Sequence, residues 1–359
     1  MRILVHEFET GSGARSGGRP VSPSLAVEGA AMRAALLADL AELPGIEVYA
    51  TADPRLCVSA PAGVRVLPPA GEAGGAFRCL VEQVDAVWLI APETDGVLER
   101  LTAVVEQTRR IVIGAGSAVI RRVSDKAWLA RRLAVRGVPV PSETGDALPV
   151  VVKPRRGAGC GGVHLARTRA EVVRAKARIR EVTGDGALVQ GYVAGVPASV
   201  SLVCDGRRAI PLAVNVQHVR PGRPFTYHGG ETPLRHPLAD RAVERALAAC
   251  DALPGLVGYV GVDIVLTTDD AIVIEVNPRL TTAYVGLRHV LDVNVAALVL
   301  AASAGALSGA APAARGRVRF SIDGRVEPIE ARATDEAREP APPSAPPAAV
   351  GRTSYSVRA

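Results

Sequence analysis

Two carboxylates and one amide near the end of the chain have the spacing of a metal site. Asp263 lies in one apolar run, and Glu275 and Asn277 lie in a second run beyond the polar segment 268–270. If the two runs form an antiparallel hairpin that turns at Asp269, Asp263 faces Glu275, and facing Cβ atoms in such pairs lie about 4.5–5.5 Å apart. Glu275 and Asn277 then share one face, because side chains alternate along a strand.

Two carboxylates at that distance repel one another unless a cation lies between them. Oxygen ligands suit Mg²⁺, which retains several waters and shares phosphate oxygens. The sequence therefore predicts a magnesium site on this face, with a solvated acidic face as the alternative. Arg279 follows closely, where a guanidinium suits clamping of phosphate or carboxylate. We expect the opposite face to pack into a core through Ile264, Leu266, Ile272, Ile274 and Val276.

A glycine-rich segment at 157–162 is the second candidate for chemistry. Gly157, Gly159 and Gly162 satisfy the G-x-G-x-x-G pattern, which would indicate a dinucleotide site. That fingerprint must open a helix directly, whereas residues 163–167 alternate like a strand and a capping box begins only at Thr168. We therefore expect a loop between two strands that presents backbone N–H groups to phosphates, with a plain mobile turn as the alternative.

Two lysines accompany this loop in a chain whose positive charge is mostly arginine. Lys153 ends the strand before the loop, and Lys126 lies in a helix predicted at 125–136. A lysine in a strand beside a glycine loop is a candidate phosphate ligand, whereas Lys126 taken alone reads as a surface residue. The apolar segment 188–193 could offer its backbone edge to an adenine ring, although by itself it reads as core.

The elements that must position these residues change in kind near residue 117. Before it, strands alternate with helices, which is typical of a parallel sheet covered by helices; the predicted strands are 2–5, 46–50, 85–90 and 111–114, and the helices 23–43, capped by Ser22, and 95–107. Beyond it we expect helices at 125–136, capped by Ser124, from 169, at 240–252 and at 292–302, and strands at 149–154, 162–167, 187–193, 199–205, 209–216, 258–266 and 271–276. A last hairpin is expected at 317–329, turning at Asp323-Gly324.

Composition narrows the function classes. Hydrophobic residues make up 48% of the 359 residues, which is enough for a large core. The net charge of +6 is mild and dispersed, so a small anionic ligand is favoured over nucleic acid. Five cysteines without a CxxC pair indicate reduced thiols and no zinc site. We found no signal peptide and no apolar run long enough for a membrane span, and therefore expect a cytoplasmic protein.

These motifs, in this order, resemble the ATP-grasp superfamily over residues 115–305, and the segment before them resembles its Rossmann-like N-terminal domain. The implied fold is α/β, with a parallel-sheet domain followed by two α+β subdomains that hold the nucleotide between them. The implied domains are 1–116, 117–194 with the glycine loop, 195–329 with the metal hairpin, and a disordered Pro/Ala-rich tail at 330–359.

The same resemblance assigns roles to residues. It implies that ATP contacts Lys126, Lys153, Gly157, Gly159, Gly161, Gly162, Gln190, Tyr192 and Val193. It implies that Asp263, Glu275 and Asn277 hold two Mg²⁺ ions, for which Mn²⁺ could substitute, and that Arg279 and Lys153 act in catalysis. The acidic residue that many members carry near Gly195 is absent here, so no ribose ligand is assigned.

Three segments resemble more narrowly the tyramine–glutamate ligases of methanofuran biosynthesis, namely 24–29, 227–233 and 277–287. This resemblance implies that ATP activates the γ-carboxylate of glutamate as an acyl phosphate, which an aromatic amine such as tyramine or tyrosine then attacks, in methanofuran- or methylofuran-type cofactor synthesis for one-carbon metabolism. It implies substrate contacts from Glu28, Tyr227, His228, Gly229, Gly230, Thr281 and Thr282, and allows a homodimer.

Several alternatives stay open at this point. His228, expected on a glycine-rich loop, is either a general base or a bystander, and Arg220 and Arg223 either hold substrate carboxylates or are solvated. The chain could be another ATP-grasp amino-acid or peptide ligase, including one that extends a glutamate chain. Less favoured alternatives are an NAD(P)-dependent oxidoreductase that uses the loop at 157–162 and a nucleotide sensor without catalysis.

Overall fold

The computed structural model describes residues 1–13, 15–16, 19–20, 23–56, 59–71, 74–143 and 147–330. Residues 1–328 form one compact unit. The predicted cap Ser22 and the predicted disordered tail beyond residue 330 lie outside the described residues. Within the described ranges, every helix is too short or too polar to cross a bilayer.

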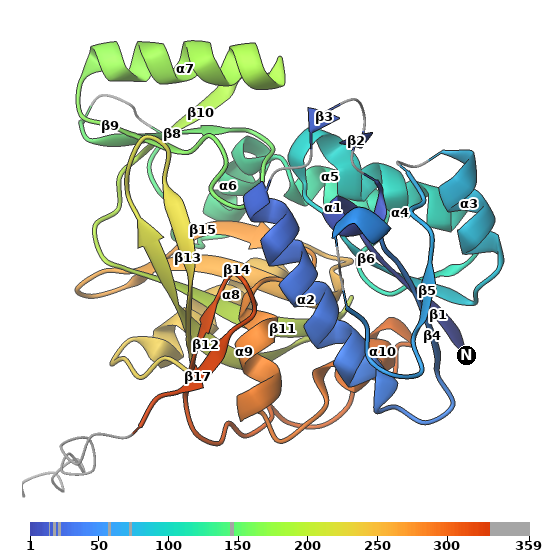
Figure 1. The fold of residues 1–359 in the computed structure, drawn as a ribbon. Helices are drawn as coiled ribbons and strands as arrows, with labels where there is room; N and C mark the ends of the chain where they lie inside the picture. The colour runs from blue at the N-terminus through green and yellow to red at the C-terminus, as the bar shows by residue number, and fades with distance from the viewer. Residues whose placement is uncertain are drawn as a thin grey trace, which may run out of the picture. The chain divides into compact units, whose positions relative to one another are not determined.

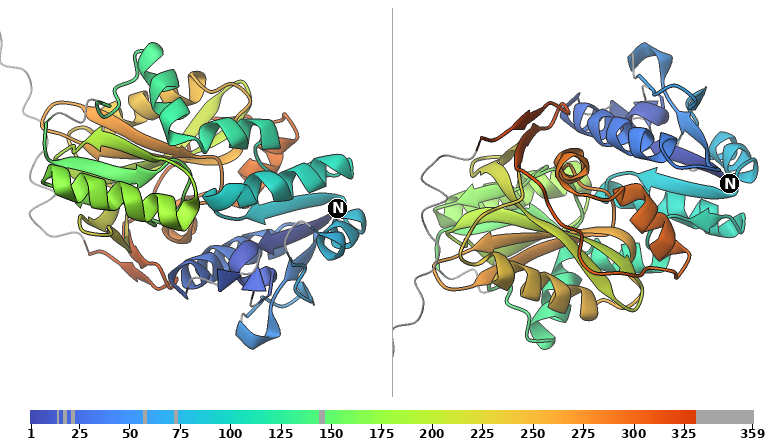
Figure 2. Two further views of the ribbon diagram at one scale, coloured as in Figure 1. Left: turned by 90° about the horizontal axis from the view of Figure 1, so that it is seen from above. Right: turned by 90° about the horizontal axis from the view of Figure 1, so that it is seen from below.

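A parallel sheet with helices on both faces forms the first third of the chain, as predicted (Figures 1 and 2). The order is β5-β4-β1-β6-β7, built from β1 (Arg2–Glu7), β4 (Glu47–Thr51), β5 (Arg65–Leu67), β6 (Ala86–Ile90) and β7 (Ile111–Val112). Ile3 and Val5 pack against α2 (Pro23–Ala41), whereas Leu4 packs toward α3 (Gly75–Glu82) and α4 (Val97–Gln107). The prediction omitted β5, α3, the short helix α1 (Phe8–Gly11) and the small hairpin of β2 (Arg15–Ser16) and β3 (Arg19–Pro20).

Two helices lead from this sheet into the second half: α5 (Ser117–Val123) and α6 (Lys126–Val135). The cap of α6 is Asp125, and the prediction of Ser124 was wrong. The Asp125 carboxylate accepts hydrogen bonds from the N–H groups of Ala127 and Trp128, both at 3.1 Å, while Ser124 ends α5. A carboxylate at a helix N-terminus also faces the positive end of the helix dipole.

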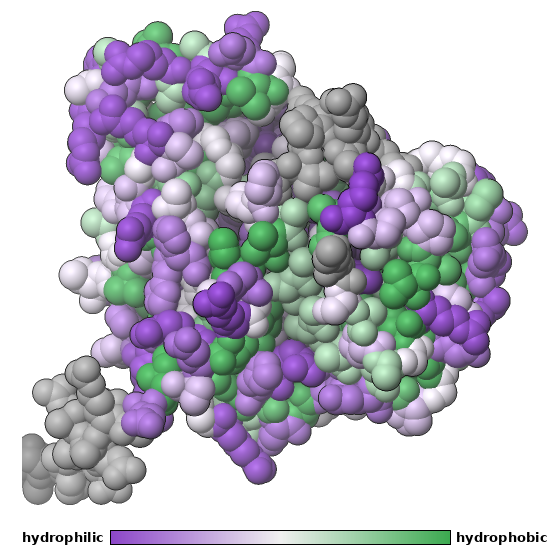
Figure 3. Space-filling view, in the orientation of Figure 1, coloured by the Kyte–Doolittle hydropathy of each residue, from purple (hydrophilic) through white to green (hydrophobic). Residues whose placement is uncertain are grey.

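A small antiparallel sheet, in the order β10-β8-β9, carries the glycine loop. It consists of β8 (Val150–Pro154), β9 (His164–Ala166) and β10 (Ala187–Gly191). The helix α7 (Arg169–Thr183) covers one face, and hydrophilic side chains dominate its outer surface (Figure 3). The predicted cap Thr168 is confirmed, since its hydroxyl accepts a hydrogen bond from the Glu171 N–H, but the Glu171 carboxylate accepts from the N–H of Arg167 and not from that of Thr168. Because residues 155–163 join two strands, the dinucleotide fingerprint does not open a helix here, which removes the basis for the NAD(P) alternative.

A seven-stranded antiparallel sheet forms the rest of the fold, in the order β15-β14-β11-β12-β13-β16-β17. Its strands are β11 (Val196–Asp205), β12 (Ala209–Arg220), β13 (Thr226–Thr232), β14 (Val257–Leu266), β15 (Ala271–Asn277), β16 (Val318–Ser321) and β17 (Val326–Pro328). The helix α8 (Ala239–Asp251) packs on one face, and α9 (Ala283–Val290) and α10 (Val295–Ser303) pack against the sheet elsewhere. The expected hairpin at 317–329 is confirmed, because β16 and β17 pair antiparallel, but residue 228, which we expected in a loop, lies in the strand β13.

The register of the β14–β15 hairpin is central to the site. Asp263 pairs with Glu275 as predicted, but the register then shifts, so that Ile264 pairs with Val273. This bulge turns Val273 into the core, whereas Ile272 and Ile274 are only partly buried, and Ile274 lines a cavity. The prediction that Ile272 and Ile274 pack into the core was therefore wrong.

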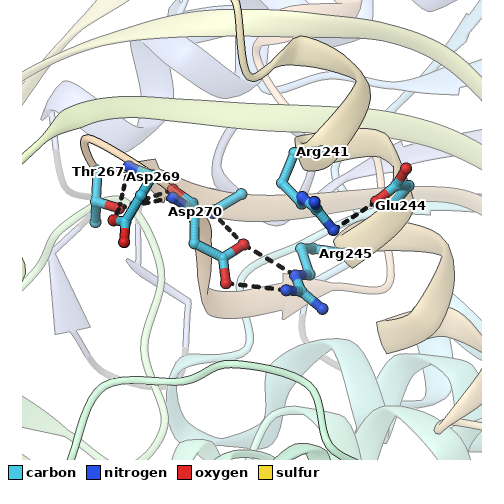
Figure 4. A network of polar contacts seen from close by, with 7 residues as sticks. Arg241, Glu244, Arg245, Thr267, Asp269 and Asp270 are labelled. Atoms are coloured by element: carbon cyan, nitrogen blue, oxygen red, sulfur yellow. Dashed lines mark hydrogen bonds and ion pairs between the residues drawn. The ribbon is translucent and has the colours of Figure 1, made fainter. Parts of the chain in front are cut away.

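The turn of this hairpin is held from outside by α8. Both carboxylate oxygens of Asp270 accept hydrogen bonds from Arg245, from its Nε at 3.1 Å and its Nη2 at 2.9 Å (Figure 4). Thr267 caps the same turn, because its hydroxyl donates to the Asp270 carbonyl at 2.9 Å. These contacts hold the turn end of β14 and β15, the two strands that carry Asp263 and Glu275.

Candidate active site

A partly open cleft, which we call the main cavity, lies between the small sheet with its glycine loop and the polar face of the large sheet. Most of the residues that the sequence singled out line it, although they come from both halves of the chain. These are Glu28, Lys126, Lys153, Gly157, Gly159, Gly161, Gln190, Tyr192, Val193, Tyr227, Asp263, Glu275, Asn277, Arg279, Thr281 and Thr282. Gly162, His228, Gly229 and Gly230 are not among its lining residues.

Both lysines point their charge at this cavity. Lys126, in the first turn of α6, donates to the Gly157 carbonyl at 2.8 Å and pairs with Glu275 at 3.1 Å. Lys153 is only 4% exposed, and its burial lowers the pKa to about 8, although the carboxylates of Glu275 and Asp263 act to raise it. Two ammonium groups beside a glycine loop are chemically suited to hold an anion such as a phosphate.

The two facing carboxylates have unequal surroundings. Burial, and next the charge of Glu275, raise the pKa of Asp263 to about 7. Burial also acts to raise the pKa of Glu275, but Lys126 and Lys153 hold it below its ordinary value. Asp263 is held by two amides: Gln217 Nε2 donates to Oδ1 at 2.8 Å, and Asn277 Nδ2 donates to Oδ2 at 3.1 Å.

This donor set fits a hard divalent cation. Asp263 pairs with Glu275 across the hairpin and is hydrogen-bonded to the Asn277 amide, and a cation would offset both the burial and the repulsion that raise the Asp263 pKa. The two carboxylates do not form a complete metal site by themselves. Within the described residues, no group of three or more His, Cys, Asp or Glu side chains lies close enough together to hold a metal ion. Water and phosphate oxygens would therefore complete the shell, which is the usual way in which Mg²⁺ binds.

Arg279 forms one wall of the cavity and is held by a residue that sequence reasoning missed. Its Nε and Nη2 donate to the two carboxylate oxygens of Glu93 at 2.9 and 3.0 Å. Its Nη1 donates to the Leu280 carbonyl at 3.0 Å. Glu93 follows β6, and nothing in its local sequence marks it, because the pair forms across 186 positions of chain.

A second polar group lies where α2, β13 and the start of α9 meet. Thr282, the N-cap of α9, donates a hydrogen bond to Glu28 on α2, and the Tyr227 phenol is hydrogen-bonded to Thr282. Burial raises the pKa of Tyr227 well above its usual range, so the phenol stays protonated. Thr281 lies beside them and shares a hydrogen bond of 3.1 Å with the Tyr259 hydroxyl.

The remaining predicted substrate residues are placed differently. His228 is exposed and bonds Thr226 at 3.0 Å, because alternation along β13 turns Tyr227 toward the cavity and His228 away from it. Gly229 and Gly230 are buried, and a Cβ there would meet the backbone carbonyls of Phe320 and Val216. Their position indicates close strand packing rather than substrate contact.

The two arginines that could have held substrate carboxylates have other surroundings. Arg223 pairs with Glu171 at 2.8 Å, and Arg220 is exposed at the end of β12. The structure therefore does not bring them into the cavity lining.

Known proteins are similar to this chain in sequence and in fold. Residues 123–283 match the family model of the ATP-grasp domain, and residues 46–120 match the model of the pre-ATP-grasp 3 domain. The tyramine–L-glutamate ligase of Methanocaldococcus fervens is 31% identical over 207 residues, which are 58% of this chain and 62% of that protein. The tyramine–L-glutamate ligase of Methanocaldococcus jannaschii is 30% identical over 58% of this chain and 59% of its own length.

The chain thus spans about three-fifths of the curated relatives that it matches. Among solved structures, an ATP-grasp superfamily protein from Archaeoglobus fulgidus superposes with a TM-score of 0.69 and 28% identity, covering 89% of this chain and 92% of that one. The ATP-grasp model alone covers the elements that carry Lys126, Lys153, Asp263 and Glu275. Residues 123–283 thus carry an ATP-grasp domain, and a pre-ATP-grasp domain precedes it at residues 46–120.

Proposed function

We propose that this protein is an ATP-dependent carboxylate–amine ligase that joins the γ-carboxylate of glutamate to an aromatic amine such as tyramine or tyrosine. The observation that carries the proposal is the pairing of Asp263 with Glu275 opposite Lys126 and Lys153 in one cavity. Two carboxylates for a metal and two ammonium groups for phosphates are what transfer of the γ-phosphoryl group of ATP requires.

The nucleotide would lie between the two sheets. Lys126 and Lys153 would hold its phosphates, and the loop from Gly157 to Gly162 would close over them. The adenine would lie against the end of β10, along Gln190, Tyr192 and Val193. Gln190 is only 2% exposed, which fits a pocket that excludes water from the base.

Asp263, Glu275 and Asn277 would hold two Mg²⁺ ions, or Mn²⁺ in their place. When bound, the metal neutralises the negative charge of the β- and γ-phosphates. The chain's own part is to orient the ligands, and Gln217 and Asn277 do this for Asp263 through its two oxygens.

In the first step, an oxygen of the substrate carboxylate attacks the γ-phosphorus, and the bond to the bridging oxygen of ADP breaks. The product is an acyl phosphate. In the second step, the amine nitrogen attacks the acyl carbon, phosphate leaves with the electron pair of the broken C–O bond, and the nitrogen releases a proton. Arg279 would neutralise charge on the transferred group, and Tyr227, Thr282 and Glu28 would shield the intermediate from water.

The choice of substrates rests on the likeness to the tyramine–L-glutamate ligases. We extend it to a role in methanofuran- or methylofuran-type cofactor synthesis in the cytoplasm. Incubation with Mg-ATP, glutamate and either tyramine or tyrosine should release ADP and give a product whose mass is that of both substrates less one water. ADP release with a different acceptor, such as glutamate itself, would point to another ATP-grasp ligase, and nucleotide binding without turnover would reject catalysis.

A further inference from the structure

The guanidinium of Arg279 is fixed by a carboxylate from the other half of the chain. Arg279 follows β15 of the large sheet, whereas Glu93 follows β6 at the carboxyl edge of the parallel sheet. Glu93 is buried and Arg279 is largely buried, with 4% and 12% of their side-chain surface exposed. The two hydrogen bonds to Glu93 and the one to the Leu280 carbonyl engage all three nitrogens of the guanidinium.

We infer that Glu93 is a positioning residue: it holds Arg279 in the orientation in which its charge faces the transferred phosphoryl group. The inference rests on the proposed function, in which Arg279 contacts the reacting group. It makes the N-terminal parallel sheet part of the catalytic geometry, although Glu93 itself is not among the residues that line the main cavity.

The charges around Arg279 show why a positioning residue is needed. Besides Glu93, its charge interacts with Glu28 and Glu275, which both line the main cavity. Glu275 already pairs with Lys126 and belongs to the candidate metal site. If Glu93 no longer accepts two hydrogen bonds, Arg279 can turn toward Glu275 and compete with Lys126 and with a bound cation.

The bidentate geometry makes this holding specific. A carboxylate matches the planar fork of a guanidinium with two parallel hydrogen bonds. A glutamine at position 93 has the same length but offers one acceptor oxygen, and its amide group repels the fork. Glu93→Gln therefore removes the orientation and leaves the packing volume unchanged.

A second charged link between the same two halves provides a matched control. Asp39 on α2 is 3% exposed and accepts hydrogen bonds from Tyr284 at 2.5 Å and from Arg288 at 2.8 Å, both on α9. None of these three residues lines the main cavity. If Glu93 only held the two halves together, Asp39→Asn and Glu93→Gln would have similar consequences.

The test compares Glu93→Gln, Asp39→Asn and the wild-type protein. We expect Glu93→Gln to lower kcat for ADP formation about 100-fold, the loss typical of a misplaced charge in an active site, with the KM for ATP changed less than about threefold. Asp39→Asn should lower the melting temperature by at least as much and leave kcat close to wild type. An unchanged kcat in Glu93→Gln, or an equal loss in Asp39→Asn, would overturn the inference.

A measurement that needs no turnover separates this inference from the proposed function. The Nε–H signal of Arg279 in the nitrogen-15 NMR spectrum, assigned by its loss in Arg279→Lys, should exchange slowly with water in wild type and rapidly in Glu93→Gln. Slow exchange in both proteins would refute the role of Glu93 whatever the activity. Inactive wild-type protein that shows the expected NMR difference would instead refute the proposed reaction and retain the positioning contact.

Discussion

The tip of the glycine loop offers a prediction whose size can be worked out from the structure. Gly159 has φ = +62°, and a Cβ at this position would lie 2.8 Å from Cδ2 of Leu25 at the start of α2. An alanine in the left-handed region costs about 1–2 kcal/mol. The contact adds about 1 kcal/mol, the low end of the overpacking range, because the tip of Leu25 can rotate away.

Gly159→Ala should therefore disfavour the observed loop position by about 2–3 kcal/mol, and if the loop must lie there during the reaction, kcat/KM for ATP falls about 30- to 150-fold. The double variant Leu25→Ala/Gly159→Ala lacks the contact with Leu25 but keeps the backbone cost, so its kcat/KM should be about fivefold higher than that of Gly159→Ala. Steady-state ADP release over a range of ATP concentrations measures both values.

Gly184, which ends α7, provides a control for the free-energy cost of placing an alanine in the left-handed backbone conformation. Its φ of +69° is similar, and nothing lies within 4 Å of a Cβ there. Gly184→Ala should lower the free energy of unfolding by about 1–2 kcal/mol and leave kcat/KM unchanged. Wild-type kcat/KM in Gly159→Ala, or no recovery in the double variant, would refute the reasoning that the loop docks on α2.

Three further predictions concern the walls of the cavity. Because burial, and to a lesser extent the charge of Lys126, lowers the pKa of Lys153 to about 8, its charge is present below pH 8 and lost above it. The kcat/KM for ATP should therefore fall about tenfold per unit above pH 8 in a pH–rate profile; a flat profile up to pH 10 would contradict this. Gln217→Leu removes the 2.8 Å hydrogen bond to Asp263 and should weaken Mn²⁺ binding about 10- to 100-fold by titration, because partners of metal ligands orient them; unchanged affinity would show that Asn277 suffices. Asp270→Asn removes the carboxylate held by Arg245 and should lower the melting temperature by about 2 °C, corresponding to about 1 kcal/mol, without altering ADP formation; a loss of activity would mean that the hairpin turn controls the site.

The parts of the site that local sequence determines could be predicted. The pairing of Asp263 with Glu275 follows from a short hairpin, in which the turn fixes the register. The loop between two strands was predictable because the capping box at Thr168 begins only after a strand-like segment. The alternating strands and helices of the first third could also be predicted, because each of these elements is recognised from residues that are close together in the sequence.

Other parts depend on contacts that no local pattern encodes. Glu93 reaches Arg279 only when the parallel sheet lies beside the large sheet, and the bulge that exposes Ile274 arises from pairing between β14 and β15. The glycines of β13 favour a loop by propensity, but tertiary packing overrides propensity where backbones of β12 and β16 approach closely. Gln217 was missed because the predicted strand ended at residue 216, whereas β12 continues to Arg220.

The most direct measurement is the rate of ADP formation as a function of Mg²⁺ concentration in the wild-type protein, Asp263→Asn and Glu275→Gln, with glutamate and tyramine present. We predict Mg²⁺-dependent turnover in the wild type and a loss of at least about 100-fold in each folded variant, since each removes one of the two carboxylates that face each other across the hairpin. Turnover at the wild-type rate in both variants would contradict the account.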